Sequence, residues 1–171
     1  MFRKLFFSTV SATALAIPAT AEDISDHADI SRLITDIAAG ADRHEWSRVR
    51  SAFGETVTVD YSSLWGGMPL TQSAEDLVAA WAGFLPGFDI THHMVTNHTI
   101  TAKEGNTATA EADFTATHRI GTEIWVLGGR YSYGFEKTGA DWAITSLTMT
   151  ALWETGDRSL VTIAGARAAA D

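Results

Sequence analysis

Apolar residues near the start of the chain recur with the period of a helix. They occupy positions i, i+3, i+4 and i+7, which places them on one helical face. Asp26 or Asp29 is a candidate cap for the start of this helix, and Gly40 weakens its end. The residues of the apolar face are Ile30, Leu33, Ile34 and Ile37.

Two further helices and one strand are predicted before residue 90. The apolar spacing in residues 46–53 indicates a short second helix, and strict alternation in residues 56–61 predicts a strand. Residues 66–69, Gly-Gly-Met-Pro, form a loop. Residues 73–76, Ser-Ala-Glu-Asp, resemble a capping box, and the helix that they open carries Trp81 on its apolar face.

The second half of the chain alternates with the period of a β-strand. Gly128 and Gly129 interrupt the third of the strands there and predict a bulge or a sharp bend. Four consecutive strands are predicted, at residues 91–102, 107–120, 123–137 and 142–153.

Short connections between these four strands imply that they pair in antiparallel fashion. The fold class is therefore α+β, with a curved antiparallel β-sheet and the N-terminal helices packed on its concave face. One face of the second strand is lined by small side chains, which let helices approach closely or leave room for a ligand. These small residues are Ala108, Ala110, Ala112 and Ala116.

The chain has 171 residues and no internal repeat, which fits one domain. Arg3 and Lys4, an apolar run over residues 5–17 and the Ala-Thr-Ala sequence at 19–21 are typical of a cleaved secretory signal. We therefore expect a signal peptide at residues 1–21, a domain at 22–157 and a C-terminal tail at 158–171. The processed protein would be periplasmic or secreted.

Charge and cysteine content exclude several classes of function. The net charge is −9, and removal of Arg3 and Lys4 would make it two units more negative. This balance argues against nucleic acid and against stable association with anionic membranes after cleavage. The chain has no cysteine, so disulfides, thiol nucleophiles and thiolate metal sites are excluded.

Asp42 and His93 are the first candidates for acid–base chemistry. Asp42 lies about 120° from Ile30 around the first helix, at the border of the apolar stripe. This position is compatible with a surface residue or with a carboxylate that leans into the interior. His92 and His93 are adjacent on a strand, so they face opposite sides, and His93 shares the inward parity of Val95 and Asn97.

Other polar and aromatic residues also have inward parity. His118 ends the small-residue face of its strand, and Tyr61 has the parity of the buried positions in its own strand. Tyr131 follows the Gly-Gly bend. Both tyrosines could donate a phenolic hydrogen bond to a substrate oxygen, although such residues are commonly core aromatics. Trp81 is a further candidate for substrate binding.

The histidine spacing does not predict a metal site. His92 and His98 stand about 20 Å apart along one strand, and no HExxH-type spacing occurs. Phosphate-binding and nucleophile-elbow glycine motifs do not occur either. We therefore expect no cofactor and no metal.

The chain resembles the SnoaL-like branch of the NTF2-like, or cone-fold, superfamily, which includes scytalone dehydratase and hexachlorocyclohexane dehydrochlorinase. The resemblance covers roughly residues 26–157. It rests on the order and spacing of DRHEW at 42–46, Asp60-Tyr61, THHMVTN at 91–97, ATHRI at 116–120, GGRYSYGFEK at 128–137 and DWAI at 141–144.

The resemblance implies roles for several residues. In those enzymes a helix aspartate pairs with a strand histidine that acts as general base, and Asp42 and His93 match these positions. His118 matches the second histidine of the dehydratase, and Tyr61 matches one of its water-holding tyrosines. Ala41 and Tyr131 depart from the dehydratase pattern, which makes scytalone itself an unsuitable substrate.

Two functions are open on these grounds. One is a cofactor-free dehydratase-type lyase, hydratase or isomerase of a small hydrophobic molecule, catalysed by Asp42, His93 and His118. The alternative is a non-catalytic module of the same fold that binds a small ligand or mediates dimerisation. We also expect a homo-oligomer, in which the outer sheet face could take part if Trp125, Trp142 or Trp153 lies on it.

Overall fold

The computed structural model describes residues 20–170, and the predicted signal peptide lies almost wholly outside them. Helices and strands alternate in the first half, and four long strands and a helix make up the second. The elements are α1 (Ala21–Asp42), α2 (Trp46–Ser51), β1 (Phe53–Asp60), α3 (Ser62–Trp65), β2 (Leu70–Ser73), α4 (Ala74–Ala82), the 3-10 turn η1 (Leu85–Gly87), β3 (Ile90–Glu104), β4 (Thr107–Ile120), β5 (Glu123–Thr138), β6 (Asp141–Gly156) and α5 (Leu160–Ala168).

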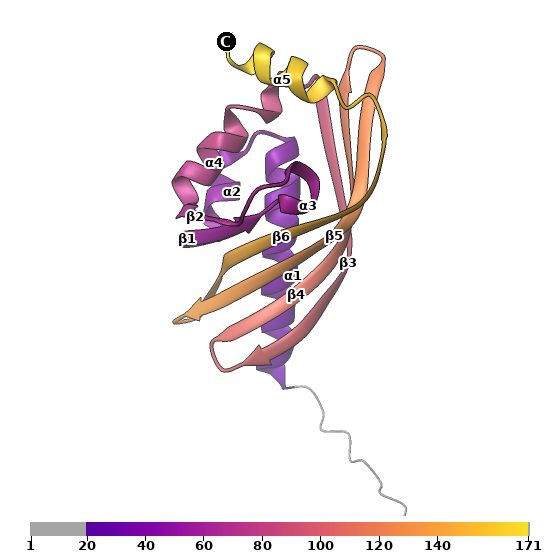
Figure 1. The fold of residues 1–171 in the computed structure, drawn as a ribbon. Helices are drawn as coiled ribbons and strands as arrows, with labels where there is room; N and C mark the ends of the chain where they lie inside the picture. The colour runs from indigo at the N-terminus through magenta and orange to yellow at the C-terminus, as the bar shows by residue number, and fades with distance from the viewer. Residues whose placement is uncertain (1–19, 171) are drawn as a thin grey trace, which may run out of the picture.

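The six strands form one bent, open sheet in the order β2-β1-β6-β5-β4-β3. Neighbouring strands are antiparallel except for β1 and β6, which run parallel. Figure 1 shows α1 running along the concave side of the sheet, with α2 and α4 beside it and α5 across one end. The α+β cone is confirmed, with one parallel pair that the sequence did not predict.

The first helix begins and ends differently from the prediction. Thr20 is its cap, in a reciprocal capping box with Asp23, so neither Asp26 nor Asp29 has that role. The helix also continues past Gly40 as far as Asp42. A Cβ at position 40 would stand 2.8 Å from a methyl group of Val49, so the glycine serves close packing of α2.

Asp26 instead holds α1 to the sheet. Its side chain is 3% exposed and forms ion pairs with Lys103 of β3 and Lys137 of β5. The indole of Trp142 donates a third hydrogen bond to it at 2.8 Å. The hydrogen bonds from Lys103, Lys137 and Trp142 lower the pKa of Asp26 well below its ordinary value. This carboxylate is therefore ionised and structural.

The predicted glycine bend is confirmed. The β5–β6 register shifts at Gly128 and Gly129, where Gly128 pairs with Trp153 and Gly129 pairs with Ala151, which leaves Leu152 as an extra residue. Trp153 is half-exposed and lies directly against Gly128, where a Cβ would come within 2.3 Å of its ring. A larger residue could not fit there, so the glycine permits both the bend and the Trp153 packing.

In strand β3, the prediction that Asn97 faces inward with His93 and Val95 is wrong. Asn97 adopts a left-handed φ of 57° and is exposed, and the register with β4 shifts between Thr96 and Thr99. His93 and Val95 are therefore inward as predicted, but Asn97 is not. After this shift, inward-facing residues begin again at His98. His92 is exposed and His98 is partly buried, so the two histidines do not share a face, contrary to the prediction.

The segment predicted to be a tail contains a helix. Leu160 and Ala164 of α5 are fully buried, and the helix packs on η1. A Cβ at Gly87 would stand 2.0 Å from the carbonyl oxygen of Ala164, so the two backbones touch. The weak helical pattern of a short Ala-rich segment did not reveal this contact. Helix α3 and strand β2 were also missed, because both have four residues.

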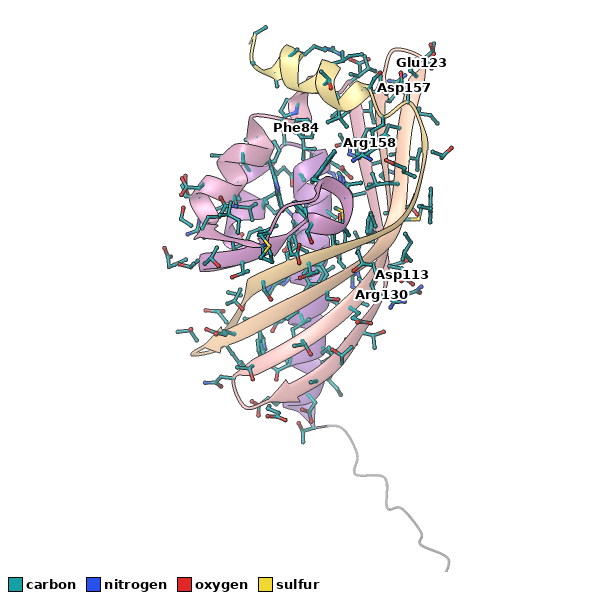
Figure 2. The ribbon with its side chains drawn as sticks, in the orientation of Figure 1. Phe84, Asp113, Glu123, Arg130, Asp157 and Arg158 are labelled. Atoms are coloured by element: carbon teal, nitrogen blue, oxygen red, sulfur yellow. The ribbon has the colours of Figure 1, made fainter. Side chains whose placement is uncertain are left out.

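The outer face of the sheet is mostly polar. Figure 2 shows the labelled Asp113 and Arg130 side by side on this face. Nε of Arg130 lies 3.6 Å from Oδ1 of Asp113. Trp125 and Trp142 are buried, and Trp153 is the tryptophan that lies on this face. The homo-oligomer stays a prediction. Among residues 20–170, no helix has the length and apolar content needed to cross a membrane.

Candidate acid–base site

Asp42 and His93 form a close pair. The last residue of α1 reaches β3, and Oδ1 of Asp42 lies 2.6 Å from Nδ1 of His93. The other carboxylate oxygen, Oδ2, accepts a hydrogen bond from the backbone N–H of His93 at 2.7 Å. The Thr91 hydroxyl donates to Oδ1 at 2.9 Å. Three donors on one strand thus fix both oxygens of the carboxylate.

These contacts set the charge of Asp42. Burial would by itself raise the pKa of the carboxyl group, because it disfavours the charged form. The hydrogen bonds and charge of His93, with the hydroxyl of Thr91, outweigh burial and lower the pKa of Asp42 below its ordinary value. Both side chains are largely buried, with exposed fractions of 13% for Asp42 and 16% for His93. The pair is therefore poised to hold the imidazole in one orientation and tautomer.

His118 lies beside this pair with a different electrostatic character. Its ring is 5.4 Å from that of His93, centroid to centroid, and perpendicular to it. Phe88 and Trp125 also pack on it, at 4.8 Å and 4.7 Å. Burial, with the charge of His93, lowers the pKa of His118 to about 4. His118 is therefore neutral at neutral pH, and its buried Nδ1 has no hydrogen-bond partner among the described residues.

A cavity of about 630 Å³ opens beside the histidines. Its size is in the range of small-molecule sites. Aromatic and aliphatic side chains from α1, α3, α4 and the inner faces of β3–β6 make up most of its wall. The described wall residues include no Asp, Glu, Lys or Arg. Such a wall favours an uncharged, hydrophobic ligand.

Three tyrosines face the same cavity. Tyr61 precedes α3, and Tyr131 and Tyr133 lie on the inner face of β5. Burial raises the pKa of all three phenols, and none of the described residues forms a hydrogen bond with their hydroxyl groups. The three phenols thus stay neutral and can donate to an oxygen atom of a ligand.

The structure brings five of the six candidate residues to one cavity wall: Tyr61, Trp81, His93, His118 and Tyr131. Asp42 is the exception, because it lies behind His93 and not on the wall. Trp81 packs edge-on against Phe53 and contributes a flat apolar surface.

Sequence reasoning missed three residues of the site. Thr91 and Tyr133 share the inward parity of His93 and Tyr131, so alternation alone could have identified them. Trp125 faces His118 directly across the β4–β5 pair, and that register follows from the short turn between the strands. Among residues 20–170, no group of three or more His, Cys, Asp or Glu side chains could hold a metal ion.

Comparison with known proteins places this fold in a family. The sequence model of the SnoaL-like domain family matches residues 22–148, which are most of the chain. The chain therefore belongs to the SnoaL-like domain family, and its fold is the NTF2-like cone. No curated protein sequence matches it.

Solved structures agree with this assignment. The Kfla4162 protein of Kribbella flavida is 27% identical with a TM-score of 0.75, over 81% of this chain and 98% of that one. A candidate scytalone dehydratase of Novosphingobium aromaticivorans is 18% identical with a TM-score of 0.68, over 80% and 91%. Hexachlorocyclohexane dehydrochlorinase LinA-type3 of Novosphingobium barchaimii is 17% identical with a TM-score of 0.66, over 80% and 93%. At such identities, the last two show a shared fold.

Proposed function

We propose that this protein is a dehydratase-type lyase, or the corresponding hydratase, that uses its own side chains for acid–base chemistry on a small uncharged hydrophobic molecule. The observation that carries the proposal is the 2.6 Å contact between Asp42 Oδ1 and His93 Nδ1 at the wall of an apolar cavity. Nδ1 is occupied by the carboxylate, so Nε2 is the ring nitrogen left to accept a proton.

The proposed reaction is an elimination. Neutral His93 takes a proton from a carbon next to a carbonyl group, and the electron pair of that C–H bond forms the new double bond. The bond between the adjacent carbon and its hydroxyl oxygen breaks, and the departing hydroxide takes the proton that His93 removed, so that it leaves as water and His93 is neutral again. Asp42 stabilises the imidazolium that forms in this step.

The tyrosines and His118 supply the other half of the chemistry. A departing oxygen or an enolate oxygen carries developing negative charge, which neutral donors in a site with little water stabilise strongly. Tyr61, Tyr131 and Tyr133 are such donors because burial raises their pKa values. His118, which is neutral near pH 7, could donate or accept one hydrogen bond but could not act as a cationic acid.

Variants of the Asp42–His93 pair test the proposal. Once a screen of uncharged cyclic hydroxyketones has identified a dehydration substrate, His93→Ala should lower kcat/KM by about 10²- to 10⁴-fold, because the proton acceptor is lost. Asp42→Asn should also lower it. His92→Ala is the matched control, because this histidine is adjacent in sequence but exposed on the opposite face. Full turnover by His93→Ala would refute the proposal.

Ligand binding separates the two functions that the family admits. If ligands of this class bind in the cavity but no turnover is found, the protein is a binding module of the same fold. Export is a separate proposal, because the predicted signal sequence lies almost wholly outside the described residues. N-terminal sequencing of the protein recovered from a bacterial periplasm should show a chain that begins at Glu22.

A further inference from the structure

One wall of the cavity is the four-residue helix α3. Leu64 and Trp65 of this helix line the cavity, and Trp65 is half-exposed at its edge. Gly66 and Gly67 follow with φ values of 74° and 86°, which favour glycine, and a Cβ at either position would meet nothing within 4 Å. The chain after α3 is therefore loosely packed, and the position of α3 depends on other contacts.

Arg158, at the start of the C-terminal segment, supplies such contacts. Nη2 of its guanidinium donates to the carbonyl oxygen of Leu64 at 2.8 Å, and Nη1 donates to Glu154 at 2.9 Å. The same group lies over the ring of Trp65, 5.0 Å from its centroid. Figure 2 shows Arg158 below α5, on the side of α3. One planar cation thus engages the backbone and the indole of α3 together.

The contacts continue from Glu154 to the acid–base site. Oε2 of Glu154 accepts a hydrogen bond from the indole N–H of Trp125 at 3.0 Å. Trp125 is directly opposite His118 in the β4–β5 register, and their rings are 4.7 Å apart. Trp65 also touches Trp125, with ring centroids 6.0 Å apart. Arg158 is therefore linked to His118 by two routes, through Glu154 and through Trp65.

We propose that Arg158 is a positioning residue that holds α3 as the movable wall of the cavity and, through Glu154, fixes Trp125 against His118. In this arrangement, the Arg158 contacts set how readily α3 moves when a ligand enters or leaves the cavity. The role of α3 in ligand traffic rests on the proposed function, whereas the effect on Trp125 and His118 is a property of the ligand-free protein.

Two hydrogen bonds of Ser63 would keep the start of α3 attached to the sheet while its other end moves. The Ser63 hydroxyl donates to the carbonyl oxygen of Met149 at 2.6 Å and accepts from the N–H of Ala151 at 3.0 Å. These bonds attach the start of α3 to the bulged part of β6. Loss of Arg158 would therefore free the end of α3 that carries Trp65 while Ser63 remains attached.

The first experiment uses the ligand-free protein. NMR spectra of Arg158→Ala should show shifted signals for the Trp125 indole N–H and the His118 ring, because the packing of the two rings loosens. Arg158→Lys should give an intermediate spectrum, since lysine keeps the charge but lacks the planar fork that reaches Leu64 and Glu154 together. Arg167→Ala is the matched control. This arginine is equally exposed at 45% and pairs with Asp89 instead of α3.

The second experiment measures ligand release by stopped-flow fluorescence, with 2-naphthol as an uncharged two-ring probe. Arg158→Ala should release the probe about tenfold faster than wild type, the factor expected for the loss of one charge-assisted hydrogen bond. Arg167→Ala should match wild type.

The outcomes separate this inference from the proposed function. Unchanged Trp125 and His118 signals in Arg158→Ala, or equal changes in Arg167→Ala, would overturn the positioning role whether or not a ligand binds. An unchanged release rate would overturn the movable wall. If wild type does not bind 2-naphthol, the choice of ligand is wrong and the NMR result alone decides the role of Arg158.

Discussion

Two buried carboxylates on the same helix, Asp26 and Asp42, have different partners. Asp26 is surrounded by two lysines and an indole N–H, all permanent donors. Asp42 is bonded to a threonine hydroxyl and to a histidine, and the charge of the histidine changes with its protonation. Both carboxylates connect α1 to β3, but only the second stands behind a cavity wall.

The difference shows how one scaffold separates stability from chemistry. A carboxylate paired with lysines keeps its partners at every pH near neutrality, so Asp26 can hold the helix but cannot move a proton. A carboxylate paired with an imidazole can stabilise two protonation states. We expect the two ends of α1, one with Asp26 and the other with Asp42, to differ in this way when either carboxylate or its partners are changed.

The largest effect on stability is expected at Asp26, near the start of α1. Asp26→Asn should lower the free energy of unfolding by about 3 kcal/mol, since it leaves two lysines beside a buried group that no longer carries charge. Asp29→Asn on the same helix is the control, because Asp29 is partly exposed and its pair with Arg32 contributes little. Denaturant unfolding measures both. A loss of similar size in the two variants would remove the distinction between Asp26 and an ordinary surface pair.

The next effect is the pH dependence of stability that His118, beside the Asp42–His93 pair, is expected to cause. The folded pKa of His118 is about 4 and its ordinary value is 6.5, so between these values the unfolded chain binds a proton that the folded protein does not. The free energy of unfolding should therefore fall as pH decreases from 6.5 to 4, by about 3 kcal/mol in total from this residue.

A variant isolates this contribution. His118→Leu should lose that part of the pH dependence, whereas His92→Ala should keep the wild-type curve. Unfolding measured at several pH values between 4 and 7 provides the comparison. Parallel curves for wild type and His118→Leu would show that the burial of His118 does not control its protonation.

The smallest effect is expected at Thr91. Thr91→Val removes one of the three donors to Asp42 and should lower the free energy of unfolding by about 1 kcal/mol. It should also shift the low-field NMR signal of the proton between His93 Nδ1 and Asp42, because Oδ1 loses its second donor. Thr91→Ser keeps the hydroxyl and should restore both properties. An unchanged proton signal in Thr91→Val would show that the threonine does not tune the pair.

Periodicity predicted most of the fold because the long strands alternate cleanly. The bounds of β4 follow from alternation alone, and Gly128-Gly129 marked the bend. Alternation failed at Asn97, where a left-handed residue shifts the phase of β3. It also missed α5, whose burial depends on a backbone contact with Gly87 that no local pattern encodes.

The candidate site was predictable only in part, for a related reason. Parity indicated that His93, His118 and Tyr61 face inward, and the family resemblance joined Asp42 to His93. The contacts of Arg158 join residues 64, 65 and 154, which are far apart in sequence. Pairings of this kind depend on the three-dimensional arrangement of α3 and β6, so they become visible only in the folded structure.

The cap at the start of α1 has a consequence for maturation. The predicted cleavage after Ala21 would remove Thr20, which closes the helix in a capping box with Asp23. The mature chain would then begin with a charged α-amino group at the positive end of a helix dipole, which is an unfavourable placement. Asp23 would keep its ion pair with Lys103 at 2.9 Å. Export would thus remove the local cap and leave the Lys103 contact to hold the first helical turn, and the precursor and the mature protein would differ in how firmly that turn is held.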